Sequence, residues 1–375
     1  MEARFVVGPP GTGKTHIFLV EKYEEGFSKY NPEEIILLSH TNVAVEQILD
    51  AIMELKQVKE KGYRRKFFKD RICTIHHYCR HKLIRRELFS EEDFKNLCAE
   101  HREFRVTKIT DSEKHPALKF IKESKGHKRT LEEHWKHKNT DHSEYSPYNI
   151  NNLKKIKELY EDYKNKNRIH DYADMIDEFN SLNKESTVEM LIVDEAQDAN
   201  IPQLTAIKKI SKNVKDNHFY LVGDPDQTIY EYAGSDADYF HKAAAKPFLE
   251  LKQGLRCGKT INEFCKNIIS PVWKHYGYER TWLPKEGVEG KIYSLSNFNP
   301  SKNLDILIKK MRNTKQSFLF SFRGTPSHTH VKDFLEHHGF EYAHIDNTAH
   351  VSKKELRSHF EWPKFIEGEP KSLVQ

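Results

Sequence analysis

The sequence predicts an α/β protein built around a parallel β-sheet, and three observations lead to this expectation. Short apolar runs alternate with stretches of helical periodicity along the chain. A glycine-rich loop follows the first apolar run, and a later run ends in two adjacent carboxylates. A length of 375 residues favours two domains, with three as the alternative.

Four strands are expected in the first part of the chain, at residues 5–7, 35–38, 190–193 and 219–222. Each run is continuously apolar and is followed by a polar or glycine-containing turn. Parallel strands that are covered by helices on both faces have this pattern. Two more strands, at 248–251 and 317–320, are expected to belong to a second α/β stretch, together with helices at 260–269 and 331–338.

A helix is expected directly after the second strand. Thr41 is a suitable N-cap residue, and the apolar residues that follow it recur at the spacing of one helical face. This helix should therefore bury a single apolar stripe. The stripe consists of Val45, Ile48, Leu49 and Ile52.

The glycine-rich loop fits the pattern G-x-x-x-x-G-K-[ST] and lies between a predicted strand and a predicted helix. Its glycines allow backbone N–H groups to surround phosphate oxygens, and the positive end of the next helix faces the same phosphates. Lys14 is expected to reach the β- and γ-phosphates, and the Thr15 hydroxyl to bind Mg²⁺. The residues predicted to bind the nucleotide, ATP or GTP, are Gly8, Pro9, Pro10, Gly11, Thr12, Gly13, Lys14 and Thr15.

Two further groups of polar residues follow predicted strands. Asp194 and Glu195 end the run at 190–193. In nucleotide hydrolases the first such acid coordinates Mg²⁺, and the second orients and deprotonates the attacking water. Gln227 follows the run at 219–222 and can hydrogen-bond a γ-phosphate. A lone Asp-Glu pair after a strand is common, and only its combination with the phosphate loop favours catalysis. The alternative interpretation of the Gln227 stretch is a tight Gly-Asp-Pro turn.

Residues 80–169 depart from the α/β pattern and are predicted to form a helical, basic insertion. Between 101 and 170 there are 17 Lys and Arg against 11 Asp and Glu, a surplus that accounts for the net charge of +5. A basic segment with aromatic side chains suits a nucleic-acid backbone with stacked bases. A solvated helical insertion is the other interpretation, and charge alone slightly favours it. The aromatic residues are Phe104, Trp135, Tyr145, Tyr148, Tyr160 and Tyr163.

The sequence contains no apolar run of about 18 residues, so no segment is expected to span a membrane. No signal peptide is evident, because the first seven residues lead directly into the glycine-rich loop. The five cysteines form no Cys-x-x-Cys pair, which favours reduced thiols. We therefore expect a cytoplasmic protein, in a bacterial cell or in a viral or phage intracellular setting.

Eight stretches of the sequence occur in the order of the motifs of one known family. The most specific are LIVDEAQD at 191–198 and LVGDPDQTIYEYAGSD at 221–236. The others are GPPGTGKT at 8–15, SHTNVAVEQI at 39–48, CTIHHYC at 73–79, DYADMI at 171–176, LKQGLRCGKTI at 251–261 and FLFSFRGTPSHTHVKDFL at 318–335. Together they resemble superfamily 1 DNA helicases of the UvrD/Rep/PcrA type, which are ATP-driven translocases on single-stranded DNA.

The resemblance implies roles for the matching residues. Asp194 would serve Mg²⁺ and Glu195 water activation, while Gln227 would sense the γ-phosphate and couple it to DNA. Arg256 lies where the family has an arginine that reaches the γ-phosphate across a cleft between domains. The DNA contacts implied by the resemblance are Thr41, Asn42, Thr74, His76 and Tyr232, the last matching an aromatic residue on which a base stacks.

The resemblance also implies a domain organisation. A RecA-like ATPase domain, 1A, would comprise 1–79 and 170–245, with the basic insertion 1B at 80–169. A partial second RecA-like domain, 2A, would follow at 246–348, with 349–375 as a candidate start of a 2B insertion. The second domain is expected to be incomplete, because the family's later motifs V and VI are not found.

The sequence departs from the family where the family binds adenine. Only seven residues precede Gly8, so the family's glutamine motif is not found, and Leu255 occupies a position that is often tyrosine. Ala233 replaces a common arginine. We therefore expect the phosphates, rather than the base, to provide most of the nucleotide contacts.

The implied function is ATP-dependent translocation along single-stranded DNA, 3′ to 5′, in which Mg²⁺-assisted hydrolysis drives unwinding at a junction of single and double strands, as in DNA repair or replication. The alternative is a truncated or split helicase subunit that binds single-stranded DNA under the control of ATP and needs a partner chain with the missing motifs. A small-molecule kinase is a weaker alternative, because the motifs around Thr41, Thr74 and Gln227 would serve no purpose in it.

Overall fold

The computed structural model describes residues 3–83, 87–104, 115–138, 148–183, 186–214, 217–292, 331–333 and 335–336. The chain forms two compact units, Met1–Ile292 and Tyr293–Gln375. The described residues of the second unit are helical. The strand predicted at 317–320, part of the helix predicted at 331–338 and the segment 349–375 lie outside the described residues.

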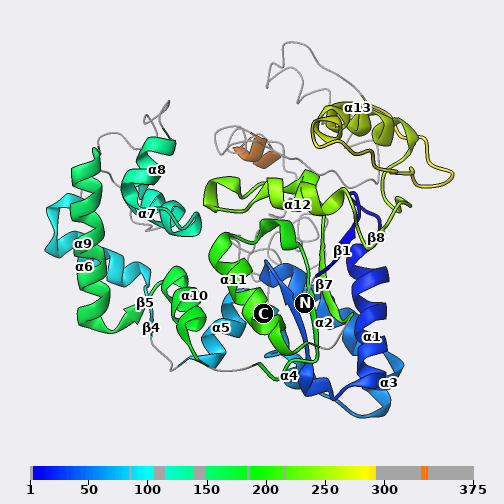
Figure 1. The fold of residues 1–375 in the computed structure, drawn as a ribbon, viewed down its shortest axis with the longest axis horizontal. Helices are drawn as coiled ribbons and strands as arrows, with labels where there is room; N and C mark the ends of the chain where they lie inside the picture. Colours follow the sequence, from blue (N-terminus) through cyan, green and yellow to red (C-terminus); the bar gives the residue numbers. More distant parts are fainter. Residues whose placement is uncertain are drawn as a thin grey trace, which may run out of the picture. The chain divides into compact units, whose positions relative to one another are not determined.

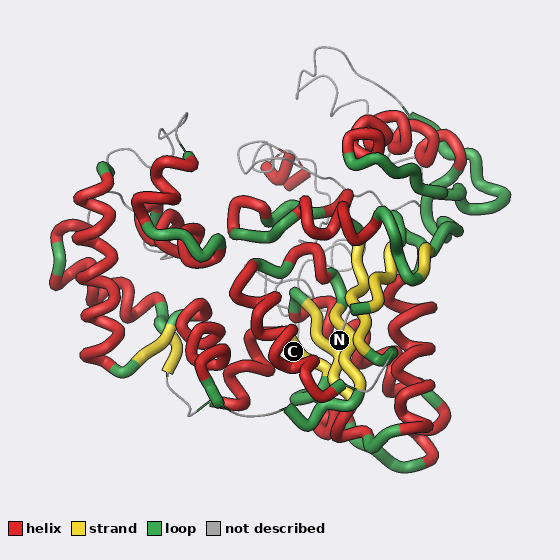
Figure 2. Tube along the Cα trace, viewed as in Figure 1, coloured by secondary structure: helices red, strands yellow, loops and turns green. Residues whose placement is uncertain are grey.

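A parallel sheet with the strand order β3-β2-β6-β7-β1-β8 forms the centre of the first unit (Figures 1 and 2). The four strands predicted in the first part of the chain are all present, and the predicted α/β fold class is confirmed. The strands are β1 (Arg4–Val7), β2 (Ile35–Ser39), β3 (Ile72–Thr74), β6 (Met190–Val193), β7 (Phe219–Gly223) and β8 (Leu249–Glu250).

The position of β8 corrects one expectation from the sequence. The apolar run at 248–251 is predicted to belong to a second α/β stretch, but β8 pairs in parallel with β1 of the first sheet, with Leu249 opposite Val6. The Phe248 N–H donates to the Phe5 carbonyl at 2.8 Å and extends this pairing. The first sheet therefore continues to Glu250, beyond the predicted domain boundary at 245. A short apolar run does not encode which sheet it joins.

Helices cover both faces of the sheet, which explains why its strands are continuously apolar. Along β2, Ile35 and Leu37 belong to one core, and Ile36 and Leu38 to the other. The first core also contains residues of α1 (Val20–Lys29), α2 (Asn42–Glu54), α3 (Lys56–Glu60) and α4 (Arg65–Phe68). The second contains residues of α5 (Ile75–Lys82), α10 (Tyr172–Ser181), α11 (Ile201–Ile210) and α12 (Ala237–Ala244).

The helix expected after the second strand is confirmed as α2. The Thr41 hydroxyl accepts a hydrogen bond from the Ala44 N–H at 3.2 Å, as an N-cap residue does. The predicted apolar stripe is fully buried against the sheet. Its buried residues are Val45, Ile48, Leu49 and Ile52.

The insertion is helical, as predicted, and has a hydrophobic core of its own (Figure 1). Its helices are α6 (Glu91–Glu100), α7 (Pro116–Gly126), α8 (Leu131–His137) and α9 (Ile150–Asn167). A two-stranded parallel ladder of β4 (Glu87–Leu88) and β5 (Ile169–His170) joins the two ends of the insertion. The ladder brings the entering and leaving chains together beside the sheet domain.

Burial corrects the interpretation of the insertion's aromatic residues as a base-stacking surface. Four of them are at most 7% exposed and belong to the core of the insertion, while Trp135 packs against that core. The buried four are Phe104, Tyr148, Tyr160 and Tyr163; Tyr145 lies outside the described residues. These rings stabilise the insertion, because aromatic side chains bury a large apolar area.

The last long helix of the first unit, α13 (Lys259–His275), includes the helix predicted at 260–269. Within the part of the chain that the structure describes, no helix combines the length and apolar character that crossing a bilayer requires.

Candidate nucleotide and DNA sites

The predicted site residues leave the sheet at one edge. The phosphate loop follows β1, Asp194 follows β6, and Gln227 lies just after β7. Val7 is in register with Gly223, and Val193 with Leu221, so these three strands end side by side. Ligands of parallel α/β sheets bind outside the carboxyl ends of the strands. The fold thus brings together side chains that lie more than 200 residues apart in the sequence.

The phosphate loop has the backbone shape that its glycines permit. Gly11 and Gly13 have φ values of +73° and +83°, which residues with a Cβ rarely adopt. The Lys14 ammonium donates to the Gly8 carbonyl at 2.8 Å and the Thr12 hydroxyl to the Pro9 carbonyl at 2.8 Å. A wide helical turn at Lys14–Leu19 then leads into α1. The loop is therefore a closed cradle whose lysine lies within it.

Arg256 lies against this loop. The Leu255 N–H donates to the Gly11 carbonyl at 2.8 Å, and a Cβ added to Gly11 would be 2.7 Å from the Arg256 Cβ. The fold therefore brings the cation predicted for the γ-phosphate next to the predicted phosphate site.

Asp194 is the most unusual carboxylate of the site. It is 2% exposed, and its Oδ1 atom has no hydrogen-bond partner among the described residues. Burial, and then the neighbouring Glu195, raise the pKa of Asp194 to about 7, while the charge of Lys14 opposes this increase. An unpartnered carboxylate oxygen beside a phosphate loop fits Mg²⁺, which proteins hold through one or two carboxylates together with substrate phosphates. The Thr15 hydroxyl is the other predicted ligand.

Glu195 follows in a strained conformation. Its φ is +47°, in the left-handed region that residues other than glycine rarely adopt and that is enriched at functional sites. The Gln197 side-chain amide donates to Glu195 Oε2 at 3.0 Å. Gln197 is itself fixed, because its Oε1 accepts a hydrogen bond from the Asp224 N–H at 3.1 Å.

Gln227 belongs to the same hydrogen-bonded chain. Its side-chain amide donates to Asp224 Oδ2 at 2.5 Å, and Asp224 is fully buried. Glu195, Gln197, Asp224 and Gln227 are thus connected through side chains and one backbone N–H. Gln197 and Asp224 lie inside the LIVDEAQD and LVGDPDQTIYEYAGSD motifs, but neither is predicted from the sequence as a site residue.

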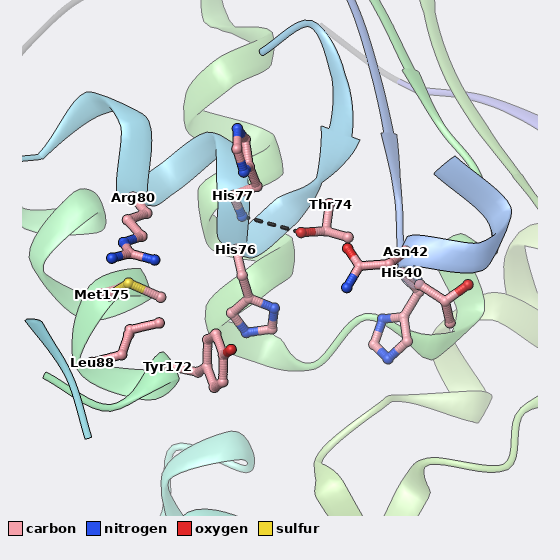
Figure 3. Close-up of a pocket in the computed structure, with 10 residues that line it drawn as sticks. His40, Asn42, Thr74, His76, His77, Arg80, Leu88, Tyr172 and Met175 are labelled. Atoms are coloured by element: carbon pink, nitrogen blue, oxygen red, sulfur yellow. Dashed lines mark hydrogen bonds between the residues drawn. The ribbon is translucent and has the colours of Figure 1, made fainter. Parts of the chain in front are cut away.

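A cavity of about 350 Å³ lies beside the ends of β2 and β3 (Figure 3). Four of the five residues predicted to contact DNA line it, namely Thr41, Asn42, Thr74 and His76. The other lining residues are His40, His77, Arg80, Leu88, Tyr172 and Met175, which sequence reasoning missed. Tyr172 lies in the DYADMI motif, so that motif was the available signal for it.

The cavity combines an exposed ring, uncharged polar groups and the cationic Arg80 side chain. Tyr172 is 53% exposed, and its ring lies 5.1 Å from the His76 ring in an edge-to-face arrangement. Burial, and then His40, lower the pKa of His76 to about 4, and burial also lowers the pKa of His40. The Thr74 hydroxyl caps α5 by accepting from the His77 N–H at 3.1 Å. Such a surface suits a base that stacks and accepts hydrogen bonds.

Tyr232 is not part of this cavity. It is 49% exposed on a turn after Gln227, with the Tyr230 ring centroid at 6.0 Å and the Lys119 ammonium 5.8 Å above its ring. Lys119 belongs to α7 of the insertion. The predicted stacking residue therefore lies where the insertion meets the loop after β7.

Comparison with known proteins shows the family of this chain. Over 299 residues, 70% of this chain and 38% of the relative, the chain is 27% identical to a probable DNA helicase II homologue from Mycoplasma capricolum subsp. capricolum. It is 28% identical over 148 residues, 38% of this chain, to 12% of the RecBCD enzyme subunit RecB from Buchnera aphidicola subsp. Schizaphis graminum. The chain thus spans less than two fifths of these relatives. The model of the UvrD/REP helicase N-terminal domain matches residues 2–247, and the chain belongs to this family.

Proposed function

We propose that this chain binds ATP with Mg²⁺ and hydrolyses it to move along single-stranded DNA. The observation that carries the proposal is the hydrogen-bonded chain from Glu195 through Gln197 and Asp224 to Gln227, beside the phosphate loop. It links a candidate base to a candidate γ-phosphate sensor. The link holds the residue that activates water and the residue that contacts the γ-phosphate in one hydrogen-bonded network.

In this proposal each residue of the nucleotide site has a separate role in ATP hydrolysis. Lys14 exchanges its bond with the Gly8 carbonyl for one with a phosphate oxygen, and Glu195 accepts a proton from the attacking water. Asp194 and Thr15 hold Mg²⁺, which neutralises charge on the phosphates. Arg256 stabilises negative charge on the transferred phosphoryl group.

The cavity lined by Thr41, Asn42, Thr74 and His76 is the proposed DNA site, with Tyr172 and Tyr232 as stacking surfaces. Membership of the helicase family supports 3′-to-5′ movement toward a junction of single and double strands. We propose that this occurs in the cytoplasm of a bacterial or virus-infected cell. The division into domains 1A, 1B, 2A and 2B is part of the same proposal.

A direct test is nucleotide binding by the purified chain. ATPγS should bind in the presence of Mg²⁺, and Lys14→Ala should weaken binding at least tenfold, because the loop loses its only lysine. Lys22→Ala, on α1 beyond the loop, is the matched control and should bind as the wild type does. Equal affinity of the wild type and Lys14→Ala would contradict the proposed site.

A second candidate function keeps both sites but requires a partner. One of the relatives is named as a subunit of a larger enzyme, which favours an ATP-gated DNA-binding subunit that unwinds only with a second polypeptide. Unwinding of partial duplexes with 3′ or 5′ tails separates the two candidates. Unwinding of the 3′-tailed duplex by the chain alone supports a helicase, whereas ATP-dependent DNA binding without unwinding supports the subunit.

A further inference from the structure

The hydrogen-bonded chain that contains Gln227 continues to an arginine far along the sequence. Arg280 lies in the segment after α13, 53 positions beyond Gln227. Its Nη1 donates to Asp224 Oδ1 at 2.6 Å and to Asp226 Oδ2 at 2.7 Å. The side chain is 2% exposed and Asp224 is fully buried, so this ion pair is shielded from water.

The two oxygens of Asp224 have different partners. Oδ1 accepts from Arg280 and, at 3.3 Å, from the Asp226 N–H, and Oδ2 accepts from the Gln227 amide. Arg280 forms the shorter of the two bonds to Oδ1, and it therefore helps to fix the rotation of the carboxylate that holds the sensor side chain. The backbone N–H of the same Asp224 donates to Gln197, which donates to Glu195. Gln227 is thus one hydrogen bond, and Glu195 two hydrogen bonds, away from Asp224, the residue that Arg280 holds.

A second element reinforces the position of Arg280. The Trp273 indole N–H, from α13, donates to Asp226 Oδ2 at 2.8 Å, the same oxygen that accepts from Arg280. Asp226 immediately precedes Gln227 in the chain. The end of α13 and the segment after it therefore clamp the turn Pro225–Gln227 from outside the motif.

The ion pairs of Arg280 with Asp224 and Asp226 contribute little to the stability of the fold. Arg280 Nε and Nη2 are buried without a hydrogen-bond partner among the described residues, and such donors reduce stability. Buried ion pairs also give little net stability, because desolvation opposes their attraction. What the Arg280 ion pair does provide is a defined orientation of the Asp224 carboxylate.

We propose that Arg280 is a positioning residue that orients the Gln227 amide toward the γ-phosphate through Asp224. The inference rests on the proposed ATPase function and adds to it a residue outside the matched family region, 2–247. In this proposal Arg280 contacts neither the substrate nor the metal. Its effect should therefore appear in turnover and in γ-phosphate discrimination, rather than in overall nucleotide affinity.

The test compares Arg280→Gln and Arg280→Lys with Arg65→Gln. Arg65 also bridges two carboxylates, Glu46 and Asp50, but on the surface of α2, so it controls for the loss of such a pair. At saturating single-stranded DNA, Arg280→Gln should lower kcat for ATP hydrolysis at least tenfold, and it should change the Kd for ADP less than threefold. Arg280→Lys keeps the charge but loses the guanidinium geometry, so its kcat should be intermediate. Arg65→Gln should retain wild-type kcat.

A binding measurement separates this inference from the proposed function. The ratio of the Kd for ADP to the Kd for ATPγS reports γ-phosphate sensing without turnover, and Arg280→Gln should lower it at least fivefold. If the wild type binds nucleotide but does not hydrolyse it, the proposed function fails and this ratio still decides the role of Arg280. An unchanged ratio and a kcat within twofold of wild type in folded Arg280→Gln would overturn the inference. If Arg280→Gln does not fold, wild-type kcat and ratio in Arg280→Lys would overturn it.

Discussion

At the scale of single residues, Asp194 and Glu195 are neighbours in the chain with different surroundings. Burial raises the pKa of Asp194 and leaves one of its oxygens unpartnered, whereas Glu195 accepts a hydrogen bond from Gln197. Different environments for two carboxylates are how enzymes give them different tasks. The arrangement favours Asp194 as the metal ligand and Glu195 as the base.

Tyr172 gives a prediction at this scale. Its exposed ring borders the proposed DNA cavity, so Tyr172→Ala should weaken binding of single-stranded DNA by roughly 5- to 100-fold, the range expected for one stacked base. Tyr172→Phe retains the ring and should bind within about twofold of wild type. Fluorescence anisotropy of a labelled oligonucleotide measures both. Wild-type affinity in Tyr172→Ala would remove Tyr172 from the DNA site.

His76 gives a prediction about pH. Since burial lowers its pKa to about 4, His76 is neutral at both pH 6 and pH 8, whereas a histidine with an ordinary pKa near 6.5 loses a proton over that range. His76→Gln should therefore change the DNA affinity by the same factor at pH 6 and at pH 8. A variant whose loss of affinity is several-fold larger at pH 6 would show that a charged His76 contributes.

At the scale of elements, the sequence predicts best where local chemistry decides. α2 follows from the N-cap Thr41 and one apolar stripe, and both are local. β8 is predicted in the second α/β stretch but joins the first sheet, because the pairing of a two-residue edge strand depends on its neighbours. Arg280 had no sequence signal, since its partners Asp224 and Asp226 lie more than 50 positions away. The site within the motifs could be predicted, but the residues that orient it could not.

The junction of α9 and α10 gives a prediction for stability. Lys164 is 2% exposed and donates to Asp171 Oδ2 at 2.9 Å. Removing Lys164 leaves the buried Asp171 carboxylate with Lys125, 3.7 Å away, as its other cation, so Lys164→Met should destabilise the protein by up to about 3–5 kcal/mol at pH 7. Thermal unfolding measures this loss. Lys154→Met, which removes a half-exposed partner of Glu132, is the control and should change stability by less than about 1 kcal/mol.

The pair of Lys164 and Asp171 also makes the stability of the protein depend on pH. Burial alone would raise the pKa of Asp171, but Lys125 and Lys164 hold it below its ordinary value. A carboxylate with a lowered pKa contributes stability that is present above its unfolded pKa, near 3.9, and is lost as the pH falls below that value. The difference between wild type and Lys164→Met should therefore narrow between pH 5 and pH 3. A constant difference would contradict this assignment.

At the scale of the whole first unit, the insertion meets the loop after β7 through two glycines. A Cβ on Gly126, at the end of α7, would lie 2.1 Å from the Ala233 carbonyl, and one on Gly234 would lie 2.4 Å from the Gly126 carbonyl carbon. This backbone contact joins the insertion to the turn that carries Tyr232. The fold thus connects the insertion to the segment that follows the proposed γ-phosphate sensor.

Widening the contact between Gly126 and the Ala233–Gly234 turn should weaken the coupling between DNA binding and ATP hydrolysis. Gly126→Ala forces the backbones apart, so stimulation of ATP hydrolysis by single-stranded DNA should fall at least threefold while hydrolysis without DNA is retained. Gly62→Ala places its Cβ where no atom lies within 4 Å, but the Gly62 φ of +67° strains an alanine, so this variant controls for a strained glycine replacement away from the contact. Full DNA stimulation in a folded Gly126→Ala protein would show that the contact is not used in coupling.

The measurement that tests the central claim most directly is ATP hydrolysis by the purified chain, with and without single-stranded DNA, compared with Glu195→Gln. Glu60→Gln on α3 is the surface control. The proposed sites predict that single-stranded DNA increases the rate of ATP hydrolysis. Glu195→Gln should lower this rate by at least 100-fold and retain ATP binding, and Glu60→Gln should leave the rate unchanged. Turnover that Glu195→Gln does not lower, or that DNA does not affect, would contradict a DNA-coupled ATPase built on Glu195 and Gln227.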